Sequence, residues 1–408
     1  MKNEGRCHIK MRVLFLTLLD FNTFEARTIY TDLLREMIKH GHDVYCISPV
    51  ERRTGIATHF EENGHILKLR IGNTQKTNIV EKGISTVMIE RQFVSAINRY
   101  YSNIKFDLVL YSTPPITFAN VVKYVKKRDG AKTYLLLKDI FPQNAVDLKM
   151  MKTKGVLGLI HKYFRMKEKK LYSFSDRIGC MSQANVDYVL QNNPELPKEK
   201  VEVCPNCIEV CDVILSEEER IRMRKEYGIP VDKRVYVYGG NLGKPQGIPF
   251  LIDCIRSQRN NQDAFFLIVG DGTEYDKLHN FAMEEKQQNF KLLKLLPKKD
   301  YDKMIASCDV GMIFLDHRFT IPNFPSRLLA YMQAGLPVLA CTDPSTDIGK
   351  VIVDGGFGWW CESNDVQAFD KVVSSIDDGR LKEIGKSSLD YLNGHYTTQQ
   401  AYKIVTRA

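Results

Sequence analysis

The sequence predicts an α/β protein with two doubly wound, Rossmann-like domains that face each other across a cleft. Short apolar runs of strand length alternate with amphipathic runs of helical length, which is the pattern of βαβ units and parallel sheets. This pattern occurs twice, with a stretch of linker character near residue 210. At 408 residues the chain is also too long for one compact domain, so two domains of about 200 residues each are expected.

The composition is that of an ordinary globular protein, with 44% hydrophobic and 26% charged residues. A formal net charge of +9 favours polyanionic surfaces, such as anionic lipid or phosphate-rich ligands, without deciding between them. No stretch reaches the roughly eighteen apolar residues of a membrane span, and the N-terminus lacks a secretory cleavage pattern. We therefore expect a cytoplasmic protein in which residues 1–10 form a short tail.

The first predicted domain covers residues 1–210 and begins with a strand at 11–18, a helix at 28–40 and a strand at 42–48. Further strands are expected at 84–89, 106–111, 133–138, 175–181 and 201–209, with helices at 92–101, 117–127 and 183–190. Ligands of such sheets bind beyond the carboxyl ends of the strands. The loops of interest are therefore 19–27, 112–115 and 138–144.

Residues 149–171 differ in character from the rest of this domain. They combine an apolar side with a dense series of eight lysines and arginines. A basic amphipathic helix of this kind can lie in the headgroup region of an anionic membrane. The alternative is a surface helix that packs on its own domain, with a solvated basic face and a structural role for Glu168.

The second predicted domain covers residues 211–389. Strands are expected at 234–238, 264–269, 290–296, 310–315, 338–340 and 358–361, with helices at 248–257, 274–285, 299–307, 328–334, 346–354 and 365–376. A last helix within residues 390–408, predicted at 390–406, is long enough to pack back on the first domain.

Residues 319–340, FTIPNFPSRLLAYMQAGLPVLA, are the most informative segment of the second domain. Two prolines hold a loop extended, Ser326 occupies an N-cap position, and the helix that follows ends at Gly335. We therefore expect the first-turn N–H groups and Arg327 at the mouth of a parallel sheet. This arrangement suits a phosphate or diphosphate, although an ordinary αβ unit with a solvated Arg327 would show the same pattern.

A second phosphate-binding candidate is the glycine-rich loop 239–247, GGNLGKPQG, which follows a predicted strand. The chain contains neither the GxGxxG unit of dinucleotide dehydrogenases nor the GxxxxGK[ST] loop of P-loop NTPases. The Asp-x-Asp sequence at 300–302 begins a predicted helix, where the helix dipole explains its carboxylates more simply than a metal does. Cations and backbone N–H groups would then ease departure of a diphosphate.

Most of the ten cysteines lie in apolar runs, where a free cysteine behaves as a small core residue. Only Cys204, Cys207 and Cys211 have ligand-like spacing. No second Cys or His pair lies nearby to complete a zinc site, so no metal site is predicted.

Several segments together carry a family resemblance. They are MRVLFLT with GHDV, STPPITFA, KDIFPQNAVDL, FSDRIGCMS, CPNCIEV, YGGNLGKPQG, IVGDGTE, the segment 319–340 and GFGWWCES. Over nearly its whole length the chain resembles the retaining, family-four glycosyltransferases of the GT-B fold. Within that family it is similar to the bacterial capsule and O-antigen enzymes that use nucleotide-activated amino sugars.

The resemblance implies transfer of a sugar, an N-acetylated hexosamine or 6-deoxyhexosamine, from a UDP donor to an acceptor hydroxyl with retention. The UDP-sugar is a substrate, and no cofactor or nucleic-acid partner is implied. Acceptors in this subgroup include polyprenyl-diphosphate-linked saccharides at the inner membrane face, used in capsule, O-antigen and exopolysaccharide synthesis. Such an acceptor would give residues 149–171 a role in peripheral membrane binding.

The resemblance also implies roles for individual residues, with the donor in the second domain and the acceptor in the first. The donor nucleotide-sugar is expected to contact Gly240, Asn241, Gly243, Lys244, Gly270, Gly272, Leu295, Ser326 and Arg327. The catalytic centre is expected to contain Lys138, Asp139 and Asn323, and the acceptor to contact Phe24, Arg27 and Asn144. Asp139 has an alternative role as an N-cap of the segment that follows it.

The chain also departs from the broader family. Two family glutamates, eight positions apart, fall on Pro322 and Ala330, and the family's Arg and Lys after the first strand of the second domain fall on Asn241 and Gln246. Arg327 is therefore the best candidate for a diphosphate ligand. The missing glutamates motivate a second hypothesis, a catalytically silent binding subunit of a polysaccharide assembly complex. A UDP-sugar epimerase of the same fold is a third.

Overall fold

The computed structural model describes residues 10–74, 77–156 and 158–407, so most of the expected N-terminal tail lies outside the described residues. The chain separates into two compact units. The first domain is formed by Met1–Ile208 with Thr398–Ala408, and the second by Glu209–Thr397. Each domain has its own sheet and its own core.

An eight-stranded sheet forms the centre of the first domain. Its strands are β1 (Arg12–Leu16), β2 (Asp43–Glu51), β3 (His59–Glu61), β4 (Ile66–Ile71), β5 (Leu108–Ser112), β6 (Lys132–Leu137), β7 (Arg177–Cys180) and β8 (Val201–Val203). The order is β3-β4-β2-β1-β5-β6-β7-β8, and all pairs are parallel except β3 with β4. The direction of winding reverses between β1 and β5, which marks the ligand-binding edge of such sheets.

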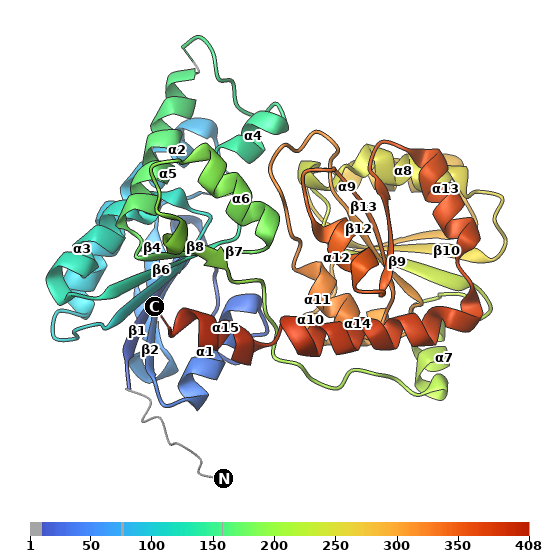
Figure 1. The fold of residues 1–408 in the computed structure, drawn as a ribbon, viewed down its shortest axis with the longest axis horizontal. Coiled ribbons are helices and arrows are strands. Elements are labelled where there is room, and N and C mark those ends of the chain that lie inside the picture. Colours follow the sequence, from blue (N-terminus) through green and yellow to red (C-terminus); the bar gives the residue numbers. More distant parts are fainter. Residues whose placement is uncertain (1–9, 75–76, 157, 408) are drawn as a thin grey trace. The chain divides into compact units, whose positions relative to one another are not determined.

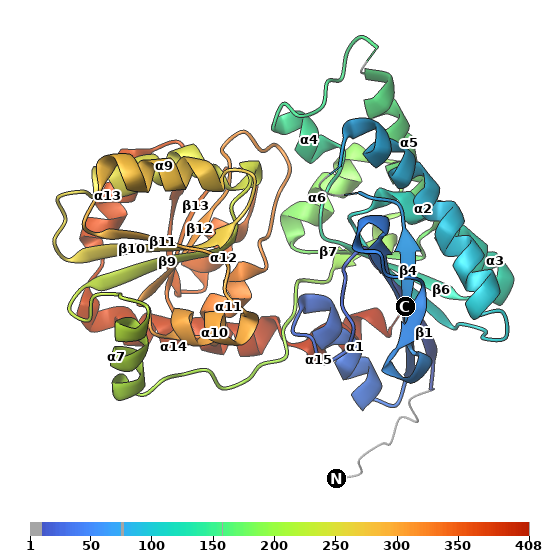
Figure 2. The ribbon, with the colours of Figure 1, turned by 180° about the vertical axis from the view of Figure 1, so that it is seen from behind.

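Helices cover both faces of this sheet (Figures 1 and 2). They are α1 (Ile29–Lys39), α2 (Ile79–Tyr100), α3 (Ala119–Asp129), α4 (Gln143–Asp147), α5 (Gly158–Phe174), α6 (Gln183–Asn192) and α15 (Thr398–Val405). α1 packs with α15 on one face, where Tyr402 bonds His42 at 2.9 Å, and α2, α3 and α5 pack together on the other. Because both faces are covered, the central strands are apolar almost throughout.

A six-stranded, fully parallel sheet forms the centre of the second domain. Its strands are β9 (Arg234–Asn241), β10 (Ala264–Asp271), β11 (Phe290–Leu293), β12 (Val310–Phe314), β13 (Val338–Thr342) and β14 (Gly358–Glu362). The order β11-β10-β9-β12-β13-β14 is that of the doubly wound dinucleotide-binding fold. The winding reverses between β9 and β12, so the loops after these strands mark the expected ligand site.

The helices of the second domain also lie on both faces of its sheet. They are α7 (Glu217–Glu226), α8 (Ile248–Ser257), α9 (Tyr275–Glu285), α10 (Lys298–Ala306), α11 (Arg327–Gln333), α12 (Ile348–Asp354), α13 (Val366–Ser375) and α14 (Leu381–His395). In Figures 1 and 2, α8, α9 and α13 cover one face, while α10, α11 and α14 cover the other. Phe369 of α13 packs on the sheet, and its ring centroid lies 6.3 Å from those of Phe266 and Phe314.

One predicted strand of the first domain is wrong. Residues 84–89 belong to α2, whose N-cap Asn78 accepts a hydrogen bond from the N–H of Glu81 at 2.9 Å. On the side of β2 away from β1, the next strand is β4, and the short β3 pairs with β4 at the edge of the sheet. The run ISTVMIE has β-branched residues typical of strands, but packing of α2 on α3 outweighs that local preference.

Two predicted helices also differ in extent. The basic helix expected at 149–171 begins only at Gly158, and residues 149–156 form turns and irregular chain. The helix expected at 390–406 is two helices, α14 and α15, separated at Tyr396 and Thr397. α14 packs on α11 within the second domain, and only α15 packs on the first domain. Helix α7 lies in the stretch expected to be a linker.

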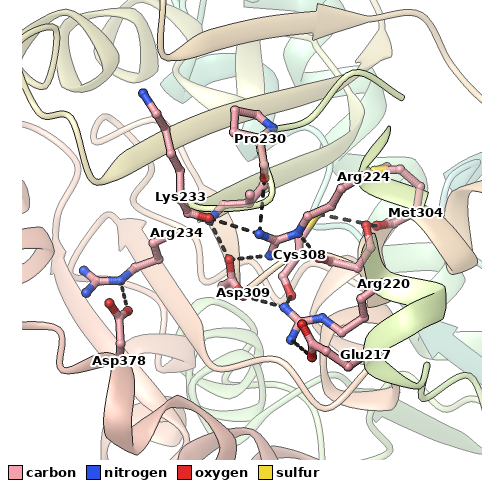
Figure 3. A network of polar contacts seen from close by, with 12 residues as sticks. Glu217, Arg220, Arg224, Pro230, Lys233, Arg234, Met304, Cys308, Asp309 and Asp378 are labelled. Atoms are coloured by element: carbon pink, nitrogen blue, oxygen red, sulfur yellow. Dashed lines mark hydrogen bonds and ion pairs between the residues drawn. The ribbon is translucent and has the colours of Figure 1, made fainter. Parts of the chain in front are cut away.

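A buried polar network ties the amino ends of β9 and β12 together (Figure 3). Asp309 accepts hydrogen bonds from Arg220 and Arg224 at 2.6 Å each, and from the N–H of Val235 at 2.7 Å. The remaining donors of Arg224 reach the carbonyls of Ser307, Pro230 and Lys233. Each arginine is therefore paired with the Asp309 carboxylate, although Nε of Arg220 is buried without a hydrogen-bond partner in the described residues. Pairing of this kind is the condition under which a buried charge is tolerated.

We expect Asp309→Asn to lower the free energy of unfolding by about 3 kcal/mol, because it leaves two largely buried guanidinium groups without their carboxylate. Asp378→Asn is the matched control. Asp378 also pairs with an arginine, Arg234, but its side chain is 70% exposed, so a change below about 1 kcal/mol is expected. Urea unfolding of both variants measures the difference, and equal losses would contradict the assigned role of Asp309.

Candidate functional site

Arg327 is the central cation at the carboxyl edge of the second-domain sheet. Its guanidinium carbon lies 4.2 Å from the centre of the Tyr238 ring, and Nη1 is buried with no hydrogen-bond partner in the described part of the chain. Tyr238 lies in β9, three residues before the strand ends at Asn241, so Arg327 is near the point where the winding reverses. A guanidinium is always charged at physiological pH. A buried donor without a partner is costly, which favours an anionic ligand at this position.

Two tyrosines hold the backbone around Arg327. The Tyr238 hydroxyl donates to the carbonyl of Asn241 at 2.9 Å, and the Tyr331 hydroxyl accepts from the N–H of Gly239 at 3.1 Å. Gly240, between these two contacts, has φ +115°, a conformation that other residues rarely adopt. A Cβ at Gly240 would lie 3.9 Å from the Arg327 guanidinium carbon, so the glycine backbone lies directly beside the cation.

The glycine-rich loop contributes a second cation but fewer N–H donors than predicted. Lys244 and Asn241 are exposed beside Gly240. The N–H of Gly243, expected to bind the donor, instead donates to Oε1 of the buried Gln246 at 3.1 Å. Gln246 therefore stabilises this turn. In this conformation the N–H of Gly243 is not available for the predicted interaction with a diphosphate.

Gly270 and Gly272 allow the β9 and β10 loops to approach closely. A Cβ on Gly270 would lie 2.0 Å from the carbonyl oxygen of Gly240, and one on Gly272 would lie 2.5 Å from that of Leu242. Both glycines are thus required by packing around the predicted donor site. Leu295, beyond β11 at the same edge, is 64% exposed and offers an apolar surface there.

The helix N-terminus at 326–328 provides fewer free donors than expected. α11 has seven residues, and Ser326 makes no capping hydrogen bond through its side chain. The N–H groups of Leu328 and Leu329 donate to the carbonyls of Pro325 and Ser326 at 3.2 and 3.1 Å. Two of the first-turn donors are therefore already used, which leaves the Arg327 side chain as the principal group for an anion.

The loop before α11 is held in place by contacts from the loop after β13. Thr346 donates through Oγ1 to the carbonyl of Asn323 at 2.5 Å, and Ser345 donates to the carbonyl of Phe319 at 3.0 Å. The Asn323 side chain is half-buried, with a 3.4 Å contact to the carbonyl of Ile321. Asn323 thus lies in a fixed loop at the sheet edge, as a sugar contact would require.

Sequence reasoning missed one ion pair at this edge. Asp316, which follows β12, accepts two hydrogen bonds from Arg318 at 2.8 and 2.6 Å. Burial alone would raise the pKa of Asp316, but the Arg318 guanidinium outweighs it and lowers the pKa. The signal was present as the charged run DHR directly after a buried strand, where ligand-site residues gather in parallel sheets.

In the first domain, Asp139 and Asn144 come together beyond β6. The Asn144 amide donates to both carboxylate oxygens of Asp139, at 2.7 and 2.8 Å. The hydroxyl of Thr113, from the loop after β5, accepts from the N–H groups of Lys138 and Asp139 and joins the two loops. Burial raises the pKa of Asp139 to about 6. The expected N-cap role is not observed, since the N-cap position of α4 is Pro142.

Two other predicted residues, Lys138 and Phe24, make contacts within the fold that differ from expectation. Lys138 extends its amine toward the carbonyl of Cys204, at 3.2 Å, and burial lowers its pKa. It therefore anchors the turn that leaves the domain. Phe24 belongs to the hydrophobic core, and its carbonyl accepts from Arg35, so packing explains it better than acceptor contact. Arg27 is half-buried beside the same loop.

A cavity of about 100 Å³ adjoins the Asp139 loop, between α5 and α6. Its lining includes Ile140, His161 and Tyr188 together with the buried Glu168. Glu168 accepts from Arg165 at 2.5 Å and from the Tyr172 hydroxyl at 2.8 Å, and burial raises its pKa. These contacts give Glu168 the structural role considered from the sequence.

Residues 149–171 carry an exposed patch that is both apolar and basic. Its apolar members are Met150, Val156, Leu159 and Ile160, which are 62%, 82%, 63% and 48% exposed. Exposed lysines at 152, 154 and 162 lie among them, while Leu157 lies outside the described residues. Other cations of the segment are neutralised within the fold, as in the Lys167–Glu90 pair at 2.6 Å. In the ranges that the structure covers, no helix is both long and apolar enough to span a bilayer.

Each half of the chain matches a family model of glycosyltransferases. Residues 26–210 match the model of Glycosyltransferase Family 4, and residues 219–383 match that of Glycosyl transferases group 1. A probable glycosyltransferase, WbjE, of Pseudomonas aeruginosa is 24% identical over 79% of each chain. The putative colanic acid biosynthesis glycosyl transferase WcaI of Escherichia coli strain K12 is 21% identical over 60% of each.

Solved structures show the same fold. A crystal structure of Anabaena HepE in complex with UDP and glucose superposes with a TM-score of 0.70 at 15% identity, covering 97% of this chain and 98% of that one. Sucrose-phosphate synthase from Thermosynechococcus elongatus gives a TM-score of 0.75 at 12% identity over 98% of both chains. With two Rossmann-like domains and a family match in each, the chain belongs to the group 1, family-four-like glycosyltransferases of the GT-B fold.

Proposed function

We propose that this enzyme transfers a sugar from a UDP donor to a saccharide carried on polyprenyl diphosphate, with retention of anomeric configuration. The proposed donor sugar is an N-acetylated hexosamine or 6-deoxyhexosamine, and the proposed pathway class is capsule, O-antigen or exopolysaccharide synthesis. The relative named for colanic acid biosynthesis and the neighbour bound to UDP and glucose support this choice. The protein would act at the cytoplasmic face of the inner membrane.

The observation that carries the proposal is the buried, unpartnered Nη1 of Arg327 at the strand reversal point. A diphosphate placed there would satisfy this donor, and the exposed amine of Lys244 would share its charge. As the glycosidic bond of the donor breaks, negative charge builds on the diphosphate. Cations already held in position lower the energy of that transition state without reorganising.

On the acceptor side, Asp139 is the proposed polar contact for the attacking saccharide. Its two oxygens are oriented by Asn144, and its near-neutral pKa lets it accept a hydrogen bond from a sugar hydroxyl at neutral pH. No base placed as in a glycosidase is required for this type of retaining transfer. Lys138 contributes by holding the neighbouring turn.

The exposed patch around Leu159 supports contact with an anionic membrane surface. Apolar side chains of Met150, Val156, Leu159 and Ile160 could enter the headgroup region, while Lys152 and Lys154 attract anionic lipid. A membrane-borne polyprenyl acceptor would require the enzyme at that surface. The proposal is therefore of peripheral membrane association, through residues at the start of α5 and before it.

We expect Arg327→Met to weaken UDP binding by about 1.5–3 kcal/mol, the range for a charged hydrogen bond, or roughly 10- to 100-fold in Kd. Calorimetric titration with UDP, GDP and dTDP, without added metal, measures the effect and identifies the base. Arg256→Met is the control, because Arg256 pairs with Glu285 and Asp253 away from this loop. Failure of every nucleotide to bind the wild type would favour the binding-subunit hypothesis.

The raised pKa of Asp139 predicts a pH-dependent stability difference. The pKa of Asp139 is about 6 in the folded protein and about 3.9 in the unfolded chain. Protonation of Asp139 therefore stabilises the fold at low pH, and this stabilisation is lost as the pH rises through 6. The Asp139→Asn variant has no carboxyl group at this position, so it does not lose this stabilisation as the pH rises. Relative to wild type, its unfolding free energy should rise by about 2 kcal/mol between about pH 4.5 and pH 8. Asp187→Asn, at an exposed site, should show no such trend.

Membrane contact predicts that Leu159→Ser with Ile160→Ser reduces co-sedimentation with vesicles containing phosphatidylglycerol about tenfold, because apolar area is lost from the interface. Lys152→Glu with Lys154→Glu should reduce it through charge, most strongly at low salt. Ile84→Ser with Val87→Ser removes a similar exposed apolar pair from α2 and should have no effect. Equal sedimentation of all variants would argue against docking through this patch.

A further inference from the structure

A groove with a volume of about 370 Å³ runs along α2 on the outer flank of the first domain. One wall is formed by α2 and the other by the end of β4, with Thr58 at the rim. The Thr58 hydroxyl accepts from the N–H of Arg70 at 3.0 Å, which holds the rim against β4. The groove lies within one domain and is separate from the loops assigned to the donor and acceptor.

Three arginines line this groove, Arg70 from β4 and Arg91 and Arg99 from α2. All three are exposed, and none forms an ion pair with any carboxylate in the described residues. Arg99 lies over the ring of Tyr100, with its guanidinium carbon 5.3 Å from the ring centre. The groove therefore carries concentrated positive charge that the protein itself does not neutralise.

The contrast with neighbouring charges makes this absence informative. Glu81 and Glu90, on the same helix, are engaged elsewhere, by Arg52 at 2.7 Å and by Lys167 at 2.6 Å. Arg53 pairs with Glu51 at 2.6 Å. These cations of the same domain thus find carboxylates, while the three arginines of the groove do not in the described residues. Arginine binds carboxylate and phosphate groups in bidentate geometry, so the natural ligand of this surface is an anion.

The shape of the groove indicates an extended ligand. The α2 residues that line it run from Met88 to Tyr100 on one face of the helix, a length of about 18 Å at the helical rise per residue. Its floor is apolar, since Leu69 and Ala96 are buried there, and Ser95 is exposed beside them. Gln92 also lines the groove, and its Oε1 is buried with no hydrogen-bond partner. The half-buried Gln92 and the exposed Ser95 add uncharged polar groups that can hydrogen-bond to the hydroxyls of a ligand.

We propose that this groove binds an extended anionic saccharide, whose carboxylate or phosphate groups meet the three arginines and whose hydroxyls meet the polar side chains. Single-stranded nucleic acid fits less well, because it needs aromatic platforms for stacking and Tyr100 is already covered by Arg99. A bilayer surface also fits less well, because interfacial binding uses a projecting apolar face rather than a recess. The proposal does not depend on the UDP site.

The test uses the full chain and a hexasaccharide of galacturonic acid as the probe. We expect calorimetric binding that weakens as NaCl is raised from about 20 to about 150 mM. Arg91→Gln with Arg99→Gln should weaken binding about tenfold or more at low salt. The control, Lys123→Gln with Lys127→Gln, removes the same charge from exposed positions of α3 and should change binding less than about twofold.

A second variant tests shape without changing charge. Ser95→Tyr, at an exposed position, should fill the groove and weaken binding about tenfold or more. Maltohexaose, which is neutral, should not bind, and UDP affinity should be unaffected by any of these variants. No binding of the galacturonate probe, or equal loss in groove and control variants, would overturn the proposal.

Three competing ligands complete the test. Pyrophosphate that binds as tightly as the hexasaccharide would reduce the groove to a simple anion site and overturn the saccharide assignment. An oligouridylate, or vesicles of phosphatidylglycerol, that bind more tightly and lose binding in the groove variants would also overturn it. Tighter binding of the hexasaccharide than of all three would support it.

Discussion

The contact between the Arg327 guanidinium and the Tyr238 ring is the interaction on which the second-domain site depends. The ring supports the cation from one side, and the same tyrosine fixes the β9 loop through Asn241. The strand end, the glycine backbone and the positive charge are therefore held as one unit. Nη1 has no partner within the described protein, and this is the reason that a nucleotide-diphosphate site is proposed here.

The two edges of the second-domain sheet have different tasks. At the amino edge, Asp309 binds two arginines and a backbone N–H, so both guanidinium charges are paired with a carboxylate. At the carboxyl edge, Arg327 and Lys244 are left without carboxylates in the described residues, while the neighbouring Arg318 is neutralised by Asp316. A stable fold needs the first arrangement, and an electrostatic binding site needs the second. The separation lets the site remain charged without weakening the sheet.

How far the sequence predicts the fold is clear from individual elements. The strands of the second domain can be predicted from their apolar runs, because a strand between two layers of helices is buried on both faces. Helix α8 can be predicted from its apolar periodicity after the glycine-rich loop. Residues 84–89 were misassigned because β-branched residues favour a strand locally, while the capped helix α2 is decided by its contacts with α3. The break between α14 and α15 likewise arises because each helix packs on a different domain.

The sequence alone determined the doubly wound class, the strand-end loops and Arg327 as a candidate, since these follow from periodicity and from residue types at predictable positions. Asp139 lies in one of these loops, and its candidate role came from the family resemblance. Only the tertiary structure decided which groups are available. The N–H groups of Gly243 and Leu328 are consumed by local turns, and Lys138 is turned to Cys204. The arginines of the α2 groove that have no carboxylate partner in the described residues can also be recognised only in the structure. Ion pairing depends on which segments pack together, not on which residues are neighbours in sequence.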